Sequence, residues 1–196
     1  MAVKILPPSI AAKIAAGEVI ERPASVVKEL VENSLDAQAT SIKVDIKNGG
    51  LELIRVSDNG LGINQSDIRT VFERFATSKI ESYEDIETIS TLGFRGEALP
   101  SIAAVSEIIL ASRLRHVEIG HFVEMNKSKF ASTGDIGMSE GTNITVNNLF
   151  QDFPARLKFL KSPRSETSRV NSLMYRYAIG YPKVKFELSI DDTVSF

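Results

Sequence analysis

The stretch Val26–Ala39, VVKELVENSLDAQA, is the part of the sequence around which the rest is organised. If this stretch forms an α-helix, four polar residues at positions i, i+3, i+4 and i+7 share one face. The opposite side is apolar, as in a half-buried helix. The polar residues are Glu29, Glu32, Asn33 and Asp36, and the apolar residues are Val26, Val27, Leu30, Val31 and Leu35.

The polar face of this helix carries three carboxylates, and we expect no cation among them because Lys28 should project away from the row. Such a row has two interpretations. One is an ordinary solvated helix face. The other is a site for a metal ion and a polyanion, whose combined binding would relieve the repulsion. The helix alone does not distinguish the two.

Composition sets limits on the class of protein. With 196 residues, 24% of them charged, the chain is long enough for one globular domain with a sizeable core and the start of another. A net charge of −2 argues against nucleic-acid binding through bulk charge, although a local basic patch is compatible with it. The absence of cysteine excludes disulfides and thiolate metal sites.

No stretch resembles a signal peptide or reaches membrane-spanning length. We therefore expect a soluble, cytoplasmic protein with no membrane partner.

Two strands are expected after the key helix. Alternating residues from Ile42 to Ile46 predict a half-buried strand, and Asn48–Gly50 predicts a hairpin turn. On the returning strand Asp58 shares a face with Ile54 and Val56, so its carboxylate should point toward the core. A carboxylate in that position requires a hydrogen-bond donor.

The remaining pattern predicts further helices, strands and loops. Expected helices are a short one at 9–16, one beginning near Asn64 with a buried stripe of Ile68, Val71, Phe72 and Phe75, a helix start after Gly93–Gly96, a basic helix at 154–160 and a longer one around 170–178. Expected strands are 107–112, 121–125, 141–146 and 184–190. Segments 80–92 and 126–140 should be a loop with one helical turn and a turn-rich region.

Several known motifs are absent. There is no G-x-x-x-x-G-K-[ST] phosphate loop and no G-x-S-x-G nucleophile motif. Gly60 and Gly62 lack the third glycine of a dinucleotide fingerprint, and His116 and His121 have no carboxylate or cysteine partner at metal-ligand spacing.

Four separated elements together offer what a nucleoside triphosphate requires, although each alone is compatible with a plain turn or a solvated face. Asp58 can accept a hydrogen bond from the exocyclic amine of adenine. Backbone amides of Gly93–Leu99, with Arg95, can bind phosphate oxygens at a helix start. Asn33 offers a neutral oxygen to Mg²⁺, and Glu29, one turn earlier, can take a proton from water.

Five stretches resemble the MutL family of DNA mismatch-repair ATPases, and the resemblance covers nearly the whole chain in order. This family belongs to the GHKL superfamily, with gyrase B, a heat-shock chaperone and the sensor histidine kinases. The matching stretches are Ala15–Pro23, Val27–Ala37, Asp58–Ile63, Ala76–Lys79 and Gly93–Leu99.

The resemblance implies an α/β fold of the Bergerat type, a two-layer sandwich with helices on one face of a mixed, mostly antiparallel sheet. It further implies that residues 1–181 form the ATPase domain, with a dimerisation segment at 1–20. Residues 182–196 would then be the truncated start of a second, transducer domain.

The resemblance also implies a role for individual residues, with ATP and Mg²⁺ as cofactors. Glu29 is the general base and Asn33 the magnesium ligand. Asp58 holds adenine, supported by Gly60, Gly62 and Thr142. The base of a mobile lid is formed by Thr77, Ser78 and Lys79, and phosphates are bound at its end by Gly93, Phe94, Arg95, Gly96, Glu97, Ala98 and Leu99.

The function implied is that of a slow, Mg²⁺-dependent ATPase in a bacterial, nucleoid-associated repair system. ATP binding would drive self-dimerisation, forming a clamp that coordinates partners on mismatched DNA, including a MutS-type recognition protein. Because the family's second domain supplies a lysine that reaches the γ-phosphate, this chain should bind ATP weakly and hydrolyse it slowly or not at all.

Three alternatives stay open at this stage. The chain could belong to another GHKL class, such as a gyrase B-like, chaperone-like or sensor-kinase-like phosphotransferase. It could also be an interaction module that binds nucleotide without hydrolysis. Separately, a basic cluster either contacts DNA or forms a solvated helix face; its members are Arg156, Lys158, Lys161 and Arg164.

Overall fold

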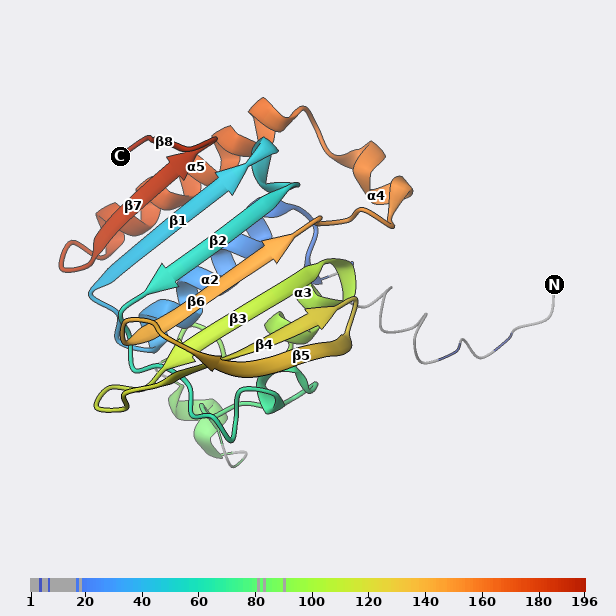
Figure 1. Ribbon diagram of the computed structural model, residues 1–196. Helices are drawn as coiled ribbons and strands as arrows, with labels where there is room; N and C mark the ends of the chain where they lie inside the picture. Colours follow the sequence, from blue (N-terminus) through green and yellow to red (C-terminus); the bar gives the residue numbers. More distant parts are fainter. Residues whose placement is uncertain are drawn as a thin grey trace.

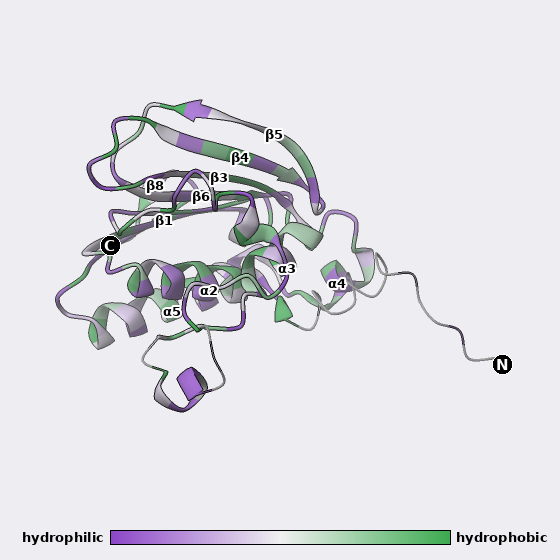
Figure 2. Ribbon diagram, turned by 90° about the horizontal axis from the view of Figure 1, so that it is seen from below, coloured by the Kyte–Doolittle hydropathy of each residue, from purple (hydrophilic) through white to green (hydrophobic). Residues whose placement is uncertain are grey.

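One eight-stranded β-sheet forms the first layer of the molecule, and helices packed on one of its faces form the second (Figures 1 and 2). The computed structural model describes residues 4, 7, 17, 19–80, 82, 84–89 and 91–196. The expected short helix at 9–16 and most of the expected dimerisation segment lie outside the described residues. The predicted two-layer α/β class is confirmed.

The sheet has the order β5-β4-β3-β6-β2-β1-β7-β8. Every pair of neighbouring strands is antiparallel except β1 and β7, which are parallel, so the predicted mixed, mostly antiparallel sheet is confirmed. The strands are β1 (Ser41–Lys47), β2 (Leu53–Asp58), β3 (Glu107–Arg113), β4 (Gly120–Asn126), β5 (Lys129–Ile136), β6 (Gly141–Asn147), β7 (Lys185–Ile190) and β8 (Thr193–Val194).

The β1–β2 hairpin follows the sequence pattern closely. Ile42, Val44 and Ile46 point into the core, and each pairs across the ladder with a residue of β2 on the same face. The chain reverses through a short 3₁₀ segment, η1 (Asn48–Gly50), in which both glycines have positive φ. This reversal confirms the predicted turn. Glycine suits it because glycine adopts that backbone region without steric cost.

In the described part of the chain, the α-helices with defined bounds are α2 (Pro23–Asp36), α3 (Ala98–Val105), α4 (Pro154–Phe159) and α5 (Pro163–Gly180). No helix in the described part of the chain is long and apolar enough to cross a membrane. In α2 the valines and Leu30 are buried as predicted, but Ser34 is buried and Leu35 is only partly so. The apolar stripe of α2 therefore includes one hydroxyl.

The helix expected to begin near Asn64 is absent. Turns and a short 3₁₀ segment, η2 (Thr70–Phe72), occupy this region; farther along, η3 (Glu84–Thr88) is the expected helical turn of the loop. Ile68 and Phe72 are buried, but Phe75 is 71% exposed, with φ of +66°. A non-glycine residue in that backbone region cannot continue a right-handed helix. The amide of Phe75 instead donates to the carbonyl of Gly96, 3.0 Å away.

The turn-rich interpretation of residues 126–140 was also wrong, because β5 lies there. This strand is at the edge of the sheet and most of its residues are exposed. Since it has no buried face, it shows no alternation of apolar and polar residues in the sequence. At the other end of the sheet, β7 is bonded to β1, and the expected domain boundary at residue 181 stays a prediction.

The start of β6 gives a stability test. Gly141 has φ of +112°, and a Cβ atom there would lie 2.0 Å from the carbonyl oxygen of Asp58. We expect Gly141→Ala to lower the free energy of unfolding by at least about 1 kcal/mol, because alanine is strained in this backbone region and cannot fit. Urea denaturation followed by circular dichroism measures the change.

Gly137→Ala is the matched control, because a Cβ at Gly137 meets nothing within 4 Å and its φ is not in the strained range. Equal unfolding midpoints for the two variants would contradict the steric account.

Candidate functional site

The polar face of α2 meets the end of β2 through a buried serine. Ser34 Oγ donates to Asp58 Oδ2 at 2.8 Å and is also within hydrogen-bond distance of the Leu30 carbonyl, at 3.1 Å. Because Asn33 precedes Ser34 on the helix, this bond brings the predicted magnesium ligand and the predicted adenine ligand into one region. Sequence reasoning missed Ser34; the available signal was a hydroxyl within an apolar helix stripe.

Asp58 accepts two further hydrogen bonds, from the backbone amides of Gly60 at 2.8 Å and Thr142 at 3.3 Å. The expected need for a hydrogen-bond donor is therefore met within the chain itself, by Ser34, Gly60 and Thr142. Burial raises the pKa of the Asp58 carboxyl above its ordinary value, while the bonds from Gly60, Ser34 and Thr142 oppose the rise.

The glycines of the loop after β2 allow close packing against two other elements. A Cβ on Gly60 would lie 2.7 Å from the carbonyl oxygen of Ala37, at the end of α2. A Cβ on Gly62, where φ is +76°, would lie 2.3 Å from the carbonyl oxygen of Arg113, at the end of β3. The loop is thus fixed beside Asp58 by backbone contacts that any side chain would block.

Thr142 is buried at the start of β6, and its Oγ1 lies 2.9 Å from Ser112 Oγ. Ser112 Oγ also contacts the amide of Ile63 at 2.8 Å, in the glycine loop. Ser112 was not predicted as a site residue, since β3 shows only an ordinary strand pattern. It links Thr142 to the loop that Gly60 begins.

Lys79 provides the first cation of the α2 face. Its ammonium donates to Asp36 Oδ2 at 2.6 Å and to Asn33 Oδ1 at 3.0 Å. The expectation of an acidic row without a cation is therefore wrong. Of its predicted neighbours, Thr77 Oγ1 accepts the Lys79 amide at 3.2 Å, and Ser78 is exposed.

Asp36 binds the loop on the far side of the site as well. Its carboxylate accepts the amides of Leu92 at 2.9 Å and Gly93 at 3.3 Å. The side chain is 8% exposed. Sequence reasoning placed Asp36 on the polar face without giving it a role. In the structure it joins three segments: α2, the Lys79 turn and the loop before α3.

Lys28 provides the second cation, and its expected projection away from the row is wrong. Its ammonium lies 2.7 Å from Glu32 Oε2 and 3.4 Å from Glu29 Oε1. The other oxygen of Glu32, Oε1, accepts the hydroxyl of Tyr177 at 2.8 Å. Burial, and next the hydrogen bond to Glu32, raise the pKa of Tyr177 far above its ordinary value.

Two glycines of the predicted phosphate-binding stretch make contacts that link it to neighbouring segments. Gly93 contacts Asp36, and Gly96, with φ of +62°, bonds to the turn at Phe75. Of the other residues of the stretch, Arg95 is exposed with its guanidinium 5.6 Å from the centre of the Phe94 ring, Glu97 pairs with Arg74 at 3.2 Å, and Ala98 and Leu99 begin α3. Their part in phosphate binding stays a prediction.

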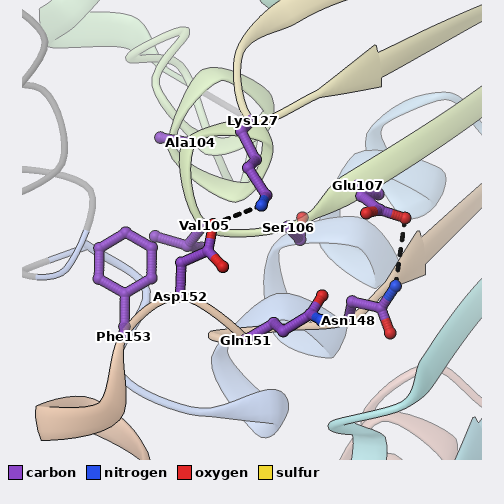
Figure 3. A pocket seen from close by; sticks show the side chains of 9 residues that line it. All are labelled: Ala104, Val105, Ser106, Glu107, Lys127, Asn148, Gln151, Asp152 and Phe153. Atoms are coloured by element: carbon purple, nitrogen blue, oxygen red, sulfur yellow. Dashed lines mark hydrogen bonds and ion pairs between the residues drawn. The ribbon is translucent and has the colours of Figure 1, made fainter.

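Two hollows in the structure lie apart from the polar face of α2. The pocket in Figure 3 has a volume of about 10 Å³, room for roughly one water, and is crossed by the ion pair of Lys127 and Asp152. A groove of about 460 Å³ between η1, α5 and β7 is lined by Lys47, Arg164 and other residues. Neither hollow includes a residue of the α2 polar face.

The histidines offer no alternative metal site. His121 Nδ1 lies 2.9 Å from Asp135 Oδ1, its partner across the β4–β5 ladder; this is a cross-strand contact and not a sequence spacing typical of metal ligands. Among the described residues there is no group of three or more His, Cys, Asp or Glu side chains that could hold a metal ion. Of the basic cluster, Arg156 donates to the carbonyl of Gly17, while Lys158, Lys161 and Arg164 are exposed.

Comparison with known families gives a match to the "Histidine kinase-, DNA gyrase B-, and HSP90-like ATPase" family over residues 20–152. Among curated proteins, the chain is 55% identical over 184 residues to a DNA mismatch repair protein MutL of Trichlorobacter lovleyi. It is 49% identical over 186 residues to that of Acidobacterium capsulatum. These alignments cover 94% and 95% of the chain, which spans 31% and 28% of the two relatives.

Solved structures give the same result. The structure titled "Aquifex aeolicus MutL ATPase domain complexed with ADP" superposes with a TM-score of 0.76 at 37% identity, covering 91% of this chain and 63% of that one. An N-terminal domain of a DNA repair protein superposes with a TM-score of 0.78 at 29% identity, covering 92% of this chain and 52% of the other.

Asp58 gives a prediction with a definite pH dependence. Because burial raises its pKa, the folded protein binds more protons than the unfolded chain just above the ordinary value of 3.8, so stability falls as pH rises through that window. Asp58→Asn keeps the shape and removes the charge. We expect the variant to melt at a higher temperature than wild type at neutral pH, with a gap that shrinks toward pH 3.8.

Thermal unfolding at several pH values measures this gap. Asp67→Asn, at an exposed turn position, controls for the loss of one negative charge. A variant that melts below wild type at neutral pH would show that the three hydrogen bonds outweigh the cost of burial.

Proposed function

Because this chain belongs to the family of histidine kinase-, DNA gyrase B- and HSP90-like ATPases, we propose that it is the ATP-binding and ATP-hydrolysing N-terminal module of a MutL-type DNA mismatch-repair protein. The observation that carries the proposal is the Lys79 contact. An ammonium already occupies the oxygen of Asn33 that should bind a metal ion, within the same polar region as Asp58.

The adenine end of the site is Asp58 with the two backbone segments that bind it. Asp58 Oδ1 already accepts two backbone amides, but Oδ2 accepts only the Ser34 hydroxyl among the bonds described. Oδ2 therefore has a lone pair left to accept from the exocyclic amine of adenine. The raised pKa indicates a carboxylate that burial disfavours, and a further donor would lower that cost. Gly60 and Gly62 hold the loop close to Asp58 by packing against the backbone of Ala37 and Arg113.

The phosphate end of the site is the row formed by Asn33, Asp36 and Lys79. Asn33 Oδ1 is a neutral oxygen that faces a cation in this structure, which suits a Mg²⁺ ligand beside phosphates. Mg²⁺, when bound, supplies neutralisation of the phosphate charge. Lys79 must then leave Asn33, and its ammonium is free to turn toward phosphate oxygens. Since Asp36 also binds Leu92 and Gly93, this movement would reach the loop before α3.

Glu29 is the group that takes a proton from water. Its side chain is 30% exposed, so solvent reaches it, and it lies one helical turn from Asn33. Lys28 contacts Glu29 Oε1 only loosely, at 3.4 Å, which leaves Oε2 as the acceptor for a water proton.

The wider functions belong to the same proposal. The names of the MutL relatives support a part in DNA mismatch repair. ATP-driven self-dimerisation through residues 1–20, action as a clamp, and work with mismatched DNA and a MutS-type protein in a bacterial cytoplasm are the further parts of the proposal. A phosphotransferase is less favoured because Glu29 is available to activate water. A module that binds nucleotide without hydrolysing it is the second candidate, and the next experiment separates the two.

We expect Glu29→Gln to abolish phosphate release while leaving the affinity for a non-hydrolysable ATP analogue unchanged, because only proton transfer requires the carboxylate. Wild type and variant should both gain melting temperature with analogue and Mg²⁺, growing logarithmically with free ligand above its dissociation constant. Phosphate release under single-turnover conditions and thermal unfolding are the measurements.

Glu52→Gln is the matched control, since Glu52 is an exposed carboxylate outside the site. If Glu29→Gln releases phosphate at the wild-type rate, Glu29 is not the base. If wild type binds the analogue but releases no phosphate, this chain on its own binds nucleotide without hydrolysing it, as expected where the second domain's lysine is required.

A further inference from the structure

Glu32 connects α5 to Glu29, the proposed general base on α2. One of its oxygens accepts the hydroxyl of Tyr177 at 2.8 Å, and the other accepts the ammonium of Lys28 at 2.7 Å. The Glu32 side chain is 14% exposed. A carboxylate this far from water needs both donors, because a lost partner is only partly replaced by solvent.

Tyr177 is well placed to keep this arrangement rigid. It is half-buried on α5, and its ring lies 6.3 Å from that of Tyr181 and 6.4 Å from that of Phe186 on β7. These neighbours fix the ring, so the hydroxyl has a defined position. The high pKa of Tyr177 keeps the hydroxyl protonated, and thus a donor, at any physiological pH.

The arrangement holds one cation between two carboxylates. Lys28 contacts Glu32 closely and Glu29 loosely, so its position depends on where Glu32 is held. Without the Tyr177 hydroxyl, Glu32 Oε1 would lack its donor, and Glu32 would compete for more of the Lys28 ammonium. Glu29 would then lose its only described contact with a cation, and with it a fixed orientation.

We propose that Tyr177 is a positioning residue for ATP hydrolysis, which acts through Glu32 and Lys28 to orient Glu29. The hydroxyl fixes Glu32, Glu32 fixes the ammonium of Lys28, and Lys28 restrains Oε1 of Glu29 so that Oε2 faces the attacking water. This inference rests on the proposed function of Glu29 as the general base. It gives α5, which holds none of the predicted nucleotide ligands, a part in the rate of the reaction.

The test is single-turnover hydrolysis of ATP by the full chain. Tyr177→Phe removes one oxygen and keeps the ring. We expect its rate constant to fall by about tenfold, a fraction of what a general base supplies, while affinity for the non-hydrolysable analogue stays within about twofold, since no proposed ligand is touched. Tyr181→Phe, which removes a hydroxyl one turn along the chain, should hydrolyse ATP at the wild-type rate.

A double variant separates positioning from a merely structural role. If Tyr177 acts through Glu32, adding Tyr177→Phe to Glu32→Gln should lower the rate no further than Glu32→Gln alone. If the double variant instead loses rate by the product of the two single-variant losses, the proposal is overturned. A wild-type rate in Tyr177→Phe, or a loss of analogue affinity equal to the loss of rate, would overturn it as well.

The failure of this inference is distinguishable from failure of the proposed function. If wild type hydrolyses ATP, Glu29→Gln does not, and Tyr177→Phe matches wild type, only the positioning role is overturned. If wild type releases no phosphate, both the hydrolysis of ATP by this chain and the positioning role of Tyr177 are overturned. Melting temperatures of all variants, measured without nucleotide, show whether each one is folded.

Discussion

A row of carboxylates on a half-buried helix is unstable unless each finds a partner, and this requirement organises the site. Helix α2 presents Glu29, Glu32, Asn33 and Asp36 along one face. Lys28 and Tyr177 satisfy Glu32, and Lys79 with two backbone amides satisfies Asp36. The partners come from α2 itself, from α5, and from the segments before α3. Neutralising one helix face therefore joins elements that are far apart in the sequence.

The same interactions explain how the fold could respond to a nucleotide. The apolar side of α2 packs on the sheet, and Ser34 fixes the helix to Asp58 at the end of β2. At this end of the site Asp58 is bonded to the Ser34 side chain of α2, to the loop amide of Gly60 and to the amide of Thr142 on β6. The other end depends on Lys79 and Asp36, whose bonds lead to loops. A ligand that carries its own cation would compete with Lys79 for Asn33, so the loop end is the part that should rearrange.

The sequence predicted much of the fold and a part of the site. The periodicity of Val26–Asp36 and the alternation in β1, β2 and β6 reflect burial of one face, so these elements were predicted correctly. The sequence-based prediction was wrong for residues 64–75, because the positive φ of Phe75 and its bond to Gly96 depend on tertiary contacts. It was also wrong for β5, because this strand is exposed at the edge of the sheet. In the site, the stripe on α2 was visible, but Ser34, Lys28 and Tyr177 were missed. Their roles depend on which residue lies opposite, and helical spacing alone does not show that.

The most direct test of the central claim is a nuclear magnetic resonance titration of the amide groups with Mg²⁺ and a non-hydrolysable ATP analogue. We predict that the amides of Gly60 and Thr142, which donate to Asp58, shift together with those of Leu92 and Gly93, which donate to Asp36, along one saturation curve. Unchanged signals at these four amides, with shifts instead around the groove lined by Lys47 and Arg164, would contradict the assignment of the nucleotide to the α2 face.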